Sequence, residues 1–199
     1  MEKRLVLASN NKGKIREFNA LFGSRGIEVV AQGELGVRAC DEPFETFLEN
    51  ALAKARNAAR QTGLPAMADD SGITARALVT EPGVHSARYA GEHADDAANN
   101  AKLVAALEKF EDKRAAYTCV LVAVRTADDP DPVVAQASWQ GEIVSTPRGS
   151  GGFGYDPYFY LPEAGKTAAE LTAEEKNAAS HRGRAMARML EALKERWGW

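Results

Sequence analysis

The pair Asp69-Asp70, followed by Ser71-Gly72, has the residue types best suited to chemistry in this sequence. The small apolar residues before it (64–68, LPAMA) predict a short buried strand that runs directly into two adjacent carboxylates. Two like charges there repel each other and lose hydration, which a cation or a proton relieves. One or two carboxylates, with water and substrate phosphates, are the ligands that Mg²⁺ takes. The alternative is a solvated turn, because Asp, Ser and Gly all favour turns.

A polar segment near the N-terminus is a candidate anion site. It comprises Ser9, Asn10, Asn11, Lys12, Gly13 and Lys14. A predicted strand over residues 4–8 precedes it, and apolar residues at helical spacing follow from Ile15. Backbone N–H groups and the positive end of a helix dipole attract anions at such a junction. The segment lacks the glycine spacing of a Walker A loop, and an N-capped helix with two solvated lysines is the alternative.

Three other places carry side chains that could contact a ligand. Lys54 lies on a predicted Ala-rich helix over residues 46–62, where it either contacts phosphate or is simply solvated. The glycine-rich segment 149–157 (GSGGFGYDP) lets backbone approach a ligand, and Phe153 can stack on a flat ring, unless the segment is only a flexible loop. His181 and Arg182 stand near the start of the last predicted helix, where cations oppose the helix dipole and so favour a functional role.

The elements that must position these residues alternate between strands and helices. Beyond those already named, strands are predicted over residues 27–31, 73–78, 115–125, 133–144 and 158–161, and a helix over 95–108. The strand at 73–78 is expected to return from a tight turn at Ser71-Gly72. The strands at 115–125 and 133–144 are expected to be antiparallel neighbours.

Composition narrows the class of protein. A chain of 199 residues can form one sizeable domain or two lobes that share a sheet. Its net charge of −3 argues against a broad, sequence-independent grip on nucleic acid or on an anionic membrane. There is no bilayer-spanning apolar run and no signal-peptide pattern. Cys40 and Cys119 suggest neither a disulfide framework nor a metal-binding pair, so we expect a reducing, cytoplasmic location.

Short segments along almost the whole chain match one family in order. They are LASNNKGK, ENALAKA, ADDSG, SARYAG, GGFGYDP and SHRG. On these motifs the sequence resembles the inosine triphosphate pyrophosphatase family, whose members remove non-standard purine nucleotides from the nucleotide pool. One departure is Ser9-Asn10-Asn11, where many relatives carry Thr-Gly-Asn, and this change keeps the polar turn.

The resemblance implies an α/β fold and a specific reaction. The fold is elongated and two-lobed, a single domain over residues 1–199, with helices flanking a long central mixed sheet and the nucleotide in a cleft between the lobes. The reaction is Mg²⁺-dependent hydrolysis of ITP, dITP and XTP to the nucleoside monophosphate and pyrophosphate. The implied partners are a small-molecule nucleotide and a second copy in a homodimer, with no nucleic acid or membrane.

The resemblance also assigns roles to residues. The segment 9–14 and Lys54 would contact the phosphates, while Glu42 and Asp70 would hold Mg²⁺. Asp70 would also accept a proton, supported by Asp69 and by Ser71, which would touch substrate. The residues implied for the base pocket are Phe153, Gly154, Tyr155, Asp156, Lys176, His181 and Arg182.

Base selection has a physical basis in this set of residues. Arg182 or His181 could donate a hydrogen bond to the 6-oxo group of hypoxanthine or xanthine. The 6-amino group of adenine would leave that donor without a partner, which costs about 1–3 kcal/mol of binding free energy. How guanine is separated from xanthine does not follow from the sequence. Two alternatives stay open: a related pyrophosphatase for pyrimidine or modified nucleotides, and a nucleotide- or RNA-binding module without chemistry. The segments SHRG and GGFGYDP favour the purine enzyme.

Overall fold

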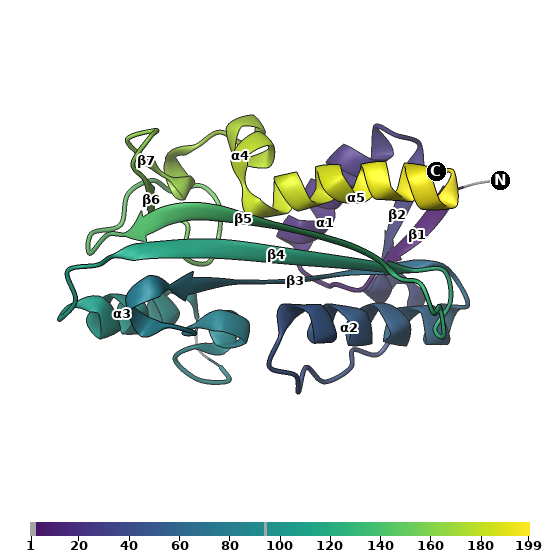
Figure 1. Ribbon diagram of the computed structural model, residues 1–199, viewed down its shortest axis with the longest axis horizontal. Helices are drawn as coiled ribbons and strands as arrows, with labels where there is room; N and C mark the ends of the chain where they lie inside the picture. The colour runs from purple at the N-terminus through teal and green to yellow at the C-terminus, as the bar shows by residue number, and fades with distance from the viewer. Residues whose placement is uncertain (1–2, 94) are drawn as a thin grey trace. The chain divides into compact units, whose positions relative to one another are not determined.

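The computed structural model describes residues 3–93 and 95–199, and its elements are shown in Figure 1. The strands are β1 (Lys3–Leu7), β2 (Ile27–Ala31), β3 (Ala66–Ala75), β4 (Arg114–Val124), β5 (Val133–Ile143), β6 (Phe159–Leu161) and β7 (Lys166–Thr167). The α-helices are α1 (Lys12–Gly23), α2 (Phe47–Thr62), α3 (Asp96–Leu107), α4 (Ala173–Ala179) and α5 (His181–Trp197). Within these described residues, no helix has both the length and the apolar character needed to cross a bilayer.

A mixed sheet of 7 strands confirms the predicted α/β class. Its strand order is β2-β1-β3-β4-β5-β6-β7. β1 runs parallel to both β2 and β3, whereas β6 is antiparallel to β5 and β7. The strands predicted over residues 115–125 and 133–144 are neighbours in the sheet, as β4 and β5.

The chain forms two compact units, which we describe separately. Unit 1 contains Met1–Asp70, Cys119–Ala137 and Arg182–Trp199, and unit 2 contains Ser71–Thr118 and Ser138–His181. The strands β3, β4 and β5 contribute residues to both. That residues 1–199 act as a single domain stays a prediction.

Unit 1 has an apolar core on each face of its part of the sheet. Leu7 and Met67 belong to a cluster with side chains of α1 and α5, and Val6 and Ala68 belong to a cluster with the alanines of α2. Successive strand residues point to opposite faces, so one strand supplies both clusters. The helices α1 and α5 therefore cover one face of this part of the sheet, and α2 covers the other.

The strand β3 corrects the predicted turn. It continues without a break from Ala66 through Asp69, Asp70 and Ser71 to Ala75, and residues 76–78 form a short 3₁₀ helix instead of a strand. The turn was predicted because Asp, Ser and Gly all favour turns. Two adjacent carboxylates inside a sheet are also costly. The cost is offset by cations that reach the two side chains from other elements, as described below.

Local capping chemistry explains where the helices begin. The side chain of Asn11 accepts hydrogen bonds from the backbone N–H groups of Gly13 (2.9 Å) and Lys14 (3.1 Å), so α1 begins at Lys12, earlier than the predicted start near Ile15. For α2, the hydroxyl of Thr46 accepts from the backbone N–H of Glu49 at 3.2 Å, so the helix begins at Phe47, directly after this cap. Part of the polar segment 9–14 is therefore the first turn of a helix.

Unit 2 has its own core, formed by aromatic and aliphatic side chains of β4, β5, β6 and α3. The rings of Tyr117 and Trp139 each contact the ring of Phe159, with centroid distances of 4.7 Å and 5.4 Å. Leu103 and Leu107 of α3 join the same cluster. This core supports the glycine-rich segment that follows β5.

The connection from β4 to β5 contains a buried carboxylate, which leads to a test of stability. Asp129 is 5% exposed and accepts hydrogen bonds from the backbone N–H groups of Arg125 (2.8 Å) and Asp131 (3.0 Å). Burial alone would raise the pKa of Asp129, but these hydrogen bonds and the Arg125 charge lower it below the ordinary value. The ionised carboxylate therefore stabilises the fold above the ordinary carboxyl pKa, and this contribution is lost as the pH falls through the lower, folded-state pKa.

Replacing Asp129 by asparagine is expected to lower the free energy of unfolding at pH 7 by about 1–2 kcal/mol, since an amide NH₂ then faces one of two N–H donors. The difference from wild type should shrink as the pH falls below about 4. Urea unfolding across pH measures both effects. Asp128→Asn, a change at the exposed neighbouring position, is the control and should leave stability nearly unchanged.

Candidate active site

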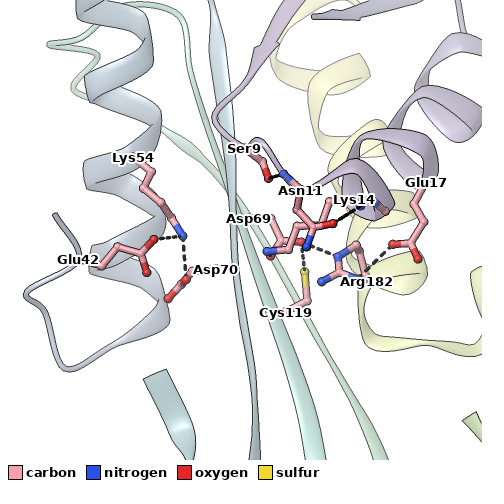
Figure 2. A network of polar contacts seen from close by, with 11 residues as sticks. Ser9, Asn11, Lys14, Glu17, Glu42, Lys54, Asp69, Asp70, Cys119 and Arg182 are labelled. Atoms are coloured by element: carbon pink, nitrogen blue, oxygen red, sulfur yellow. Dashed lines mark hydrogen bonds and ion pairs between the residues drawn. The ribbon is translucent and has the colours of Figure 1, made fainter. Parts of the chain in front are cut away.

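The strand β3 places the two adjacent acids of unit 1 on opposite faces of the sheet (Figure 2). Asp69 lies on the face of Met67 and contacts Cys119 of the same apolar cluster. Asp70 lies on the face of Ala68, towards α2. Both are buried, with only 2% and 7% of their surfaces exposed. Each carboxylate therefore meets a different set of partners.

Asp69 is compensated by two cations. Its Oδ1 accepts a hydrogen bond from Lys14 Nζ of α1 at 2.9 Å, and its Oδ2 accepts from Arg182 Nε of α5 at 2.6 Å. Arg182 also donates through Nη1 to Glu17 Oε2 at 3.1 Å. Burial alone would lower the pKa of Arg182, but the charges of Asp69 and Glu17 outweigh it and raise the pKa. Asp69 thus fixes the position of Lys14 at the start of α1.

Asp70 is only partly compensated. Its Oδ1 accepts from Lys54 Nζ of α2 at 2.8 Å, and the same ammonium lies 3.1 Å from Glu42 Oε1, so two carboxylates share one lysine (Figure 2). Its Oδ2 is buried and has no hydrogen-bond partner among residues 3–93 and 95–199. Burial raises the pKa of Asp70, Lys54 opposes this and Glu42 adds to it. Burial would lower the pKa of Lys54, but Asp70 and Glu42 raise it. A further cation would relieve this excess of negative charge.

This donor set fits a hard cation that brings other ligands with it. The described part of the chain has no group of three or more His, Cys, Asp or Glu side chains arranged to hold a metal. Mg²⁺ needs fewer, because it keeps several waters and takes one or two carboxylates together with substrate phosphates. The unpartnered oxygen of Asp70 and the nearby carboxylate of Glu42 match that requirement.

A polar cavity of about 190 Å³ in unit 1 brings several predicted residues together. Those that line it are Ser9, Asn10, Lys14, Glu42, Lys54 and Asp69. The side chain of Asn11 caps α1 instead, and Lys12 and Gly13 form the first turn of that helix. The cavity therefore combines the end of β1, the start of α1 and the middle of α2.

Sequence reasoning missed some of the residues at this site. Gln32, Cys40 and Asn57 also line the cavity. The sequence could have predicted two of them. Asn57 is three residues after Lys54 on a predicted helix, so the two side chains share a face. Gln32 directly follows β2, just as Ser9 comes shortly after the parallel strand β1. Cys40 could not be predicted, because it sits in an irregular loop.

In unit 2, Asp156 organises the glycine-rich segment. Its Oδ2 accepts from the backbone N–H of Phe153 at 2.8 Å and from Lys176 Nζ at 2.6 Å. The Lys176 ammonium also lies 4.7 Å from the centroid of the Phe153 ring. Gly152 has φ +74°, and a Cβ there would come within 2.0 Å of Asp156 Oδ2, so only glycine fits. The segment folds around one carboxylate and leaves Phe153 37% exposed.

His181 lies against the aromatic core of unit 2. Its ring stacks on Tyr117 with centroids 4.5 Å apart and planes only 3° from parallel. The Tyr117 hydroxyl in turn lies 3.4 Å from Asp156 Oδ1, and burial together with Asp156 raises the pKa of Tyr117. Sequence reasoning missed Tyr117 because a tyrosine within a strongly apolar strand is typical of core. It connects two residues that were predicted for the base pocket.

The remaining predicted residues have supporting contacts. The Tyr155 hydroxyl donates to the backbone carbonyl of Ser86 at 2.7 Å, so the SARYAG motif anchors the glycine-rich segment. Ser71 directly follows Asp70 in β3. Arg182, predicted for the base pocket, has its contacts with Asp69 and Glu17 in unit 1. Glu17 is three residues after Lys14 on one helix, so the sequence predicts that these two side chains are neighbours. The contact of Glu17 with Arg182 cannot be predicted in this way.

A larger cavity in unit 2, of about 550 Å³, contains none of the predicted site residues. Side chains of α3 and the end of β5 line it, and most of them are apolar, such as Val104, Leu107 and Ile143. Size alone therefore does not identify the reactive site.

Comparisons with known proteins agree with the motifs. The sequence pattern of the Ham1 family matches residues 5–192. A protein of Ralstonia nicotianae named dITP/XTP pyrophosphatase is 60% identical over 195 residues, which is 96% of this chain and 97% of that protein. One of the same name from Nitrosomonas europaea is 58% identical over 192 residues, 96% and 95% of the two chains. The solved structure of a HAM1 protein from Coxiella burnetii superposes with a TM-score of 0.91 at 47% identity, covering 96% of this chain and 98% of the other. The motifs predicted membership of the inosine triphosphate pyrophosphatase family, and these comparisons show that this chain belongs to the Ham1 family.

Proposed function

We propose that this protein hydrolyses dITP, XTP and ITP to the nucleoside monophosphate and pyrophosphate. Relatives about 60% identical over most of the chain carry the name dITP/XTP pyrophosphatase. The observation that carries the proposal is the partly compensated Asp70, with one buried unpartnered oxygen, beside Glu42 and Lys54, which line the polar cavity. Two carboxylates next to lysines suit a divalent cation bound to a polyphosphate, which carries both signs of charge, better than they suit the free cation or the free polyphosphate.

The phosphates would bind to donors that line this cavity. Lys14 and Lys54 supply positive charge, and Ser9 and Asn10 supply polar groups at the start of α1. The pairing of Lys14 with Asp69 holds its ammonium in place, so little ordering is left for substrate to impose. Positive charge fixed near the leaving pyrophosphate stabilises the charge that develops as the bond between the α- and β-phosphates breaks.

Asp70 and Glu42 are proposed to hold Mg²⁺. When bound, the ion neutralises phosphate charge and polarises the phosphoryl oxygens. The fit rests on the unpartnered Oδ2 of Asp70 and on the two carboxylates that share Lys54. Asp69 is a poor candidate for this role, because Lys14 and Arg182 already compensate its charge.

Asp70 is also proposed to accept the proton of the attacking water. The water oxygen forms a bond to the α-phosphorus, the bond to the leaving pyrophosphate breaks, and the water proton passes to the carboxylate. A carboxylate held near the metal can orient the water or accept its proton. The substrate-side role of Ser71 remains part of this proposal.

Residues of unit 2 are proposed to recognise the base. Phe153 presents a partly exposed ring for stacking, with Lys176 and Asp156 fixed beside it, and Gly154 and Tyr155 complete the segment. A 6-oxo purine can accept a hydrogen bond from Lys176 or His181, whereas the 6-amino group of adenine cannot.

A homodimer and a cytoplasmic location are proposed from the family resemblance. Light scattering of the purified protein measures whether it is a dimer.

A substrate panel tests the proposal. With Mg²⁺, purified protein should release pyrophosphate from ITP, dITP and XTP with a kcat/KM at least about 10²-fold above that for ATP, the discrimination expected when buried polar groups are left unmatched. Removing the ion with EDTA should stop the reaction. Equal rates on every nucleotide, or orthophosphate as the first product, would contradict the proposal. Tight nucleotide binding without turnover would instead favour a binding module.

A further inference from the structure

We propose that Asp96 and Asn100 of α3 are positioning residues that hold the base-contacting segment at Gly154 and thereby set the selectivity for the purine. This inference rests on the proposed function and adds residues that neither the motifs nor the cavities identify. All of the contacts that carry it lie within unit 2.

The two side chains together bind both backbone polar groups of one residue. Asp96 Oδ2 accepts from the backbone N–H of Gly154 at 2.7 Å, and Asn100 Nδ2 donates to the Gly154 carbonyl at 2.9 Å. Asp96 and Asn100 are four residues apart on a helix, so their side chains lie on the same face, one turn apart. A helix thereby holds a segment that forms neither helix nor strand.

Gly154 needs such support because of its conformation. It has φ +64°, and no atom lies within 4 Å of a Cβ built at this position. Glycine has no side chain to pack at this position, so hydrogen bonds to its backbone N–H and carbonyl hold this residue. Gly154 directly follows Phe153, whose exposed ring is proposed to stack on the base. Movement at Gly154 would be passed on to that ring and to Lys176, whose ammonium lies 4.7 Å from the ring centroid and is proposed to donate to the 6-oxo group.

The stability of α3 accounts for only part of the role of these two side chains. Asp96 lies in the first turn, where an acidic residue suits the helix dipole, and Asn100 Nδ2 also donates to the Asp96 carbonyl at 2.7 Å. Asp95 already caps the helix by accepting from the backbone N–H of Ala98 at 2.8 Å. Asn100 is 3% exposed, and its Oδ1 is buried without a hydrogen-bond partner among the described residues. A buried unpaired amide oxygen destabilises a fold, and an apolar side chain would avoid it. Its presence is accounted for if the amide serves to hold Gly154.

The adjacent Asn99 provides a matched control. It is equally buried, at 3%, but it holds a different segment: its Oδ1 accepts from the backbone N–H of Ala90 at 2.8 Å, and its Nδ2 donates to the Ala87 carbonyl at 3.1 Å. A change at Asn99 keeps both hydrogen bonds to Gly154. It therefore measures what the loss of a buried asparagine on α3 does otherwise, including any effect through the SARYAG segment, which contacts Tyr155.

The test compares selectivity among variants. Asp96 is exposed, so Asp96→Ala removes no core packing. This variant and Asn100→Leu should each raise the KM for ITP and lower the ratio of kcat/KM for ITP over ATP by about 3–10-fold, the size expected for one hydrogen bond. Inhibition by pyrophosphate, which reports on the residues of unit 1, should stay at the wild-type value. Asp96→Asn, whose amide oxygen can still accept from Gly154, should recover most of the ratio.

The outcomes separate this inference from the proposed function. If wild-type protein does not prefer ITP to ATP, the proposed function and this inference both fail. If wild type is selective and Asp96→Ala and Asn100→Leu keep its ratio, only the positioning role is wrong. If Asn99→Ala lowers the ratio as much as Asp96→Ala, the effect is general to α3 and the inference is again overturned.

Discussion

Replacing Asp70 by asparagine is expected to reduce pyrophosphate release from ITP by about 10²–10⁴-fold, the range that a lost general base produces. Asparagine has nearly the same shape, but it cannot accept a proton and offers no anionic oxygen to a cation. Lys54 would keep its contact with Glu42 at 3.1 Å, so the surroundings should change little. Steady-state kinetics with ITP and Mg²⁺ measures the loss, and near-normal turnover would remove Asp70 from its proposed role.

The same variant is expected to be no less stable than wild type at neutral pH. Burial raises the pKa of Asp70, which means that the folded protein disfavours the ionised form relative to the unfolded chain. The charge therefore destabilises the fold above the unfolded pKa, and a neutral side chain removes that effect. Asp69→Asn is the matched contrast, because it breaks the contacts with Lys14 and Arg182 and should lower the unfolding temperature clearly. Equal unfolding temperatures for the two variants would contradict this distinction.

Replacing Arg182 by methionine is expected to lower the free energy of unfolding by about 3–5 kcal/mol, the typical effect of removing one partner from a buried ion pair. The side chains of Asp69 and Arg182 are 0% and 5% exposed. Without the guanidinium, Lys14 alone would compensate Asp69, and Glu17 would lose its contact at 3.1 Å. Urea unfolding measures the change. At this chain length it corresponds to a fall in the unfolding temperature of roughly 10 °C.

Two further variants show whether the missing charge is the cause. Arg182→Lys should recover part of the stability, because it restores the charge without the fixed geometry of the guanidinium. Arg182→Met combined with Asp69→Asn should be less destabilised than the sum of the single changes, because no unpaired carboxylate is left at position 69. If Arg182→Met instead unfolds like wild type while its preference for ITP over ATP collapses, the guanidinium acts on the base, as the sequence predicted.

Local signals were sufficient for most of the elements. Short-range periodicity located β2, β4 and β5 to within a residue or so, because burial alternates or persists over a few residues. The beginning of α2 followed from Thr46, whose hydroxyl satisfies the backbone N–H of Glu49, only three positions away. α1 was placed too late, because its start was taken from the first apolar residue at helical spacing, Ile15, although an N-capped helix was one of the two alternatives.

The sequence by itself determined the family, the acidic pair and the lysines near it, because motif order and residue type do not depend on how the chain folds. Only the tertiary structure decided that β3 continues through Asp69 and Asp70 and turns them to opposite faces. The cations that permit this lie far along the chain, with Lys14 and Arg182 separated from Asp69 by 55 and 113 residues. No local pattern encodes such contacts, since they exist only once α1 and α5 pack on the sheet.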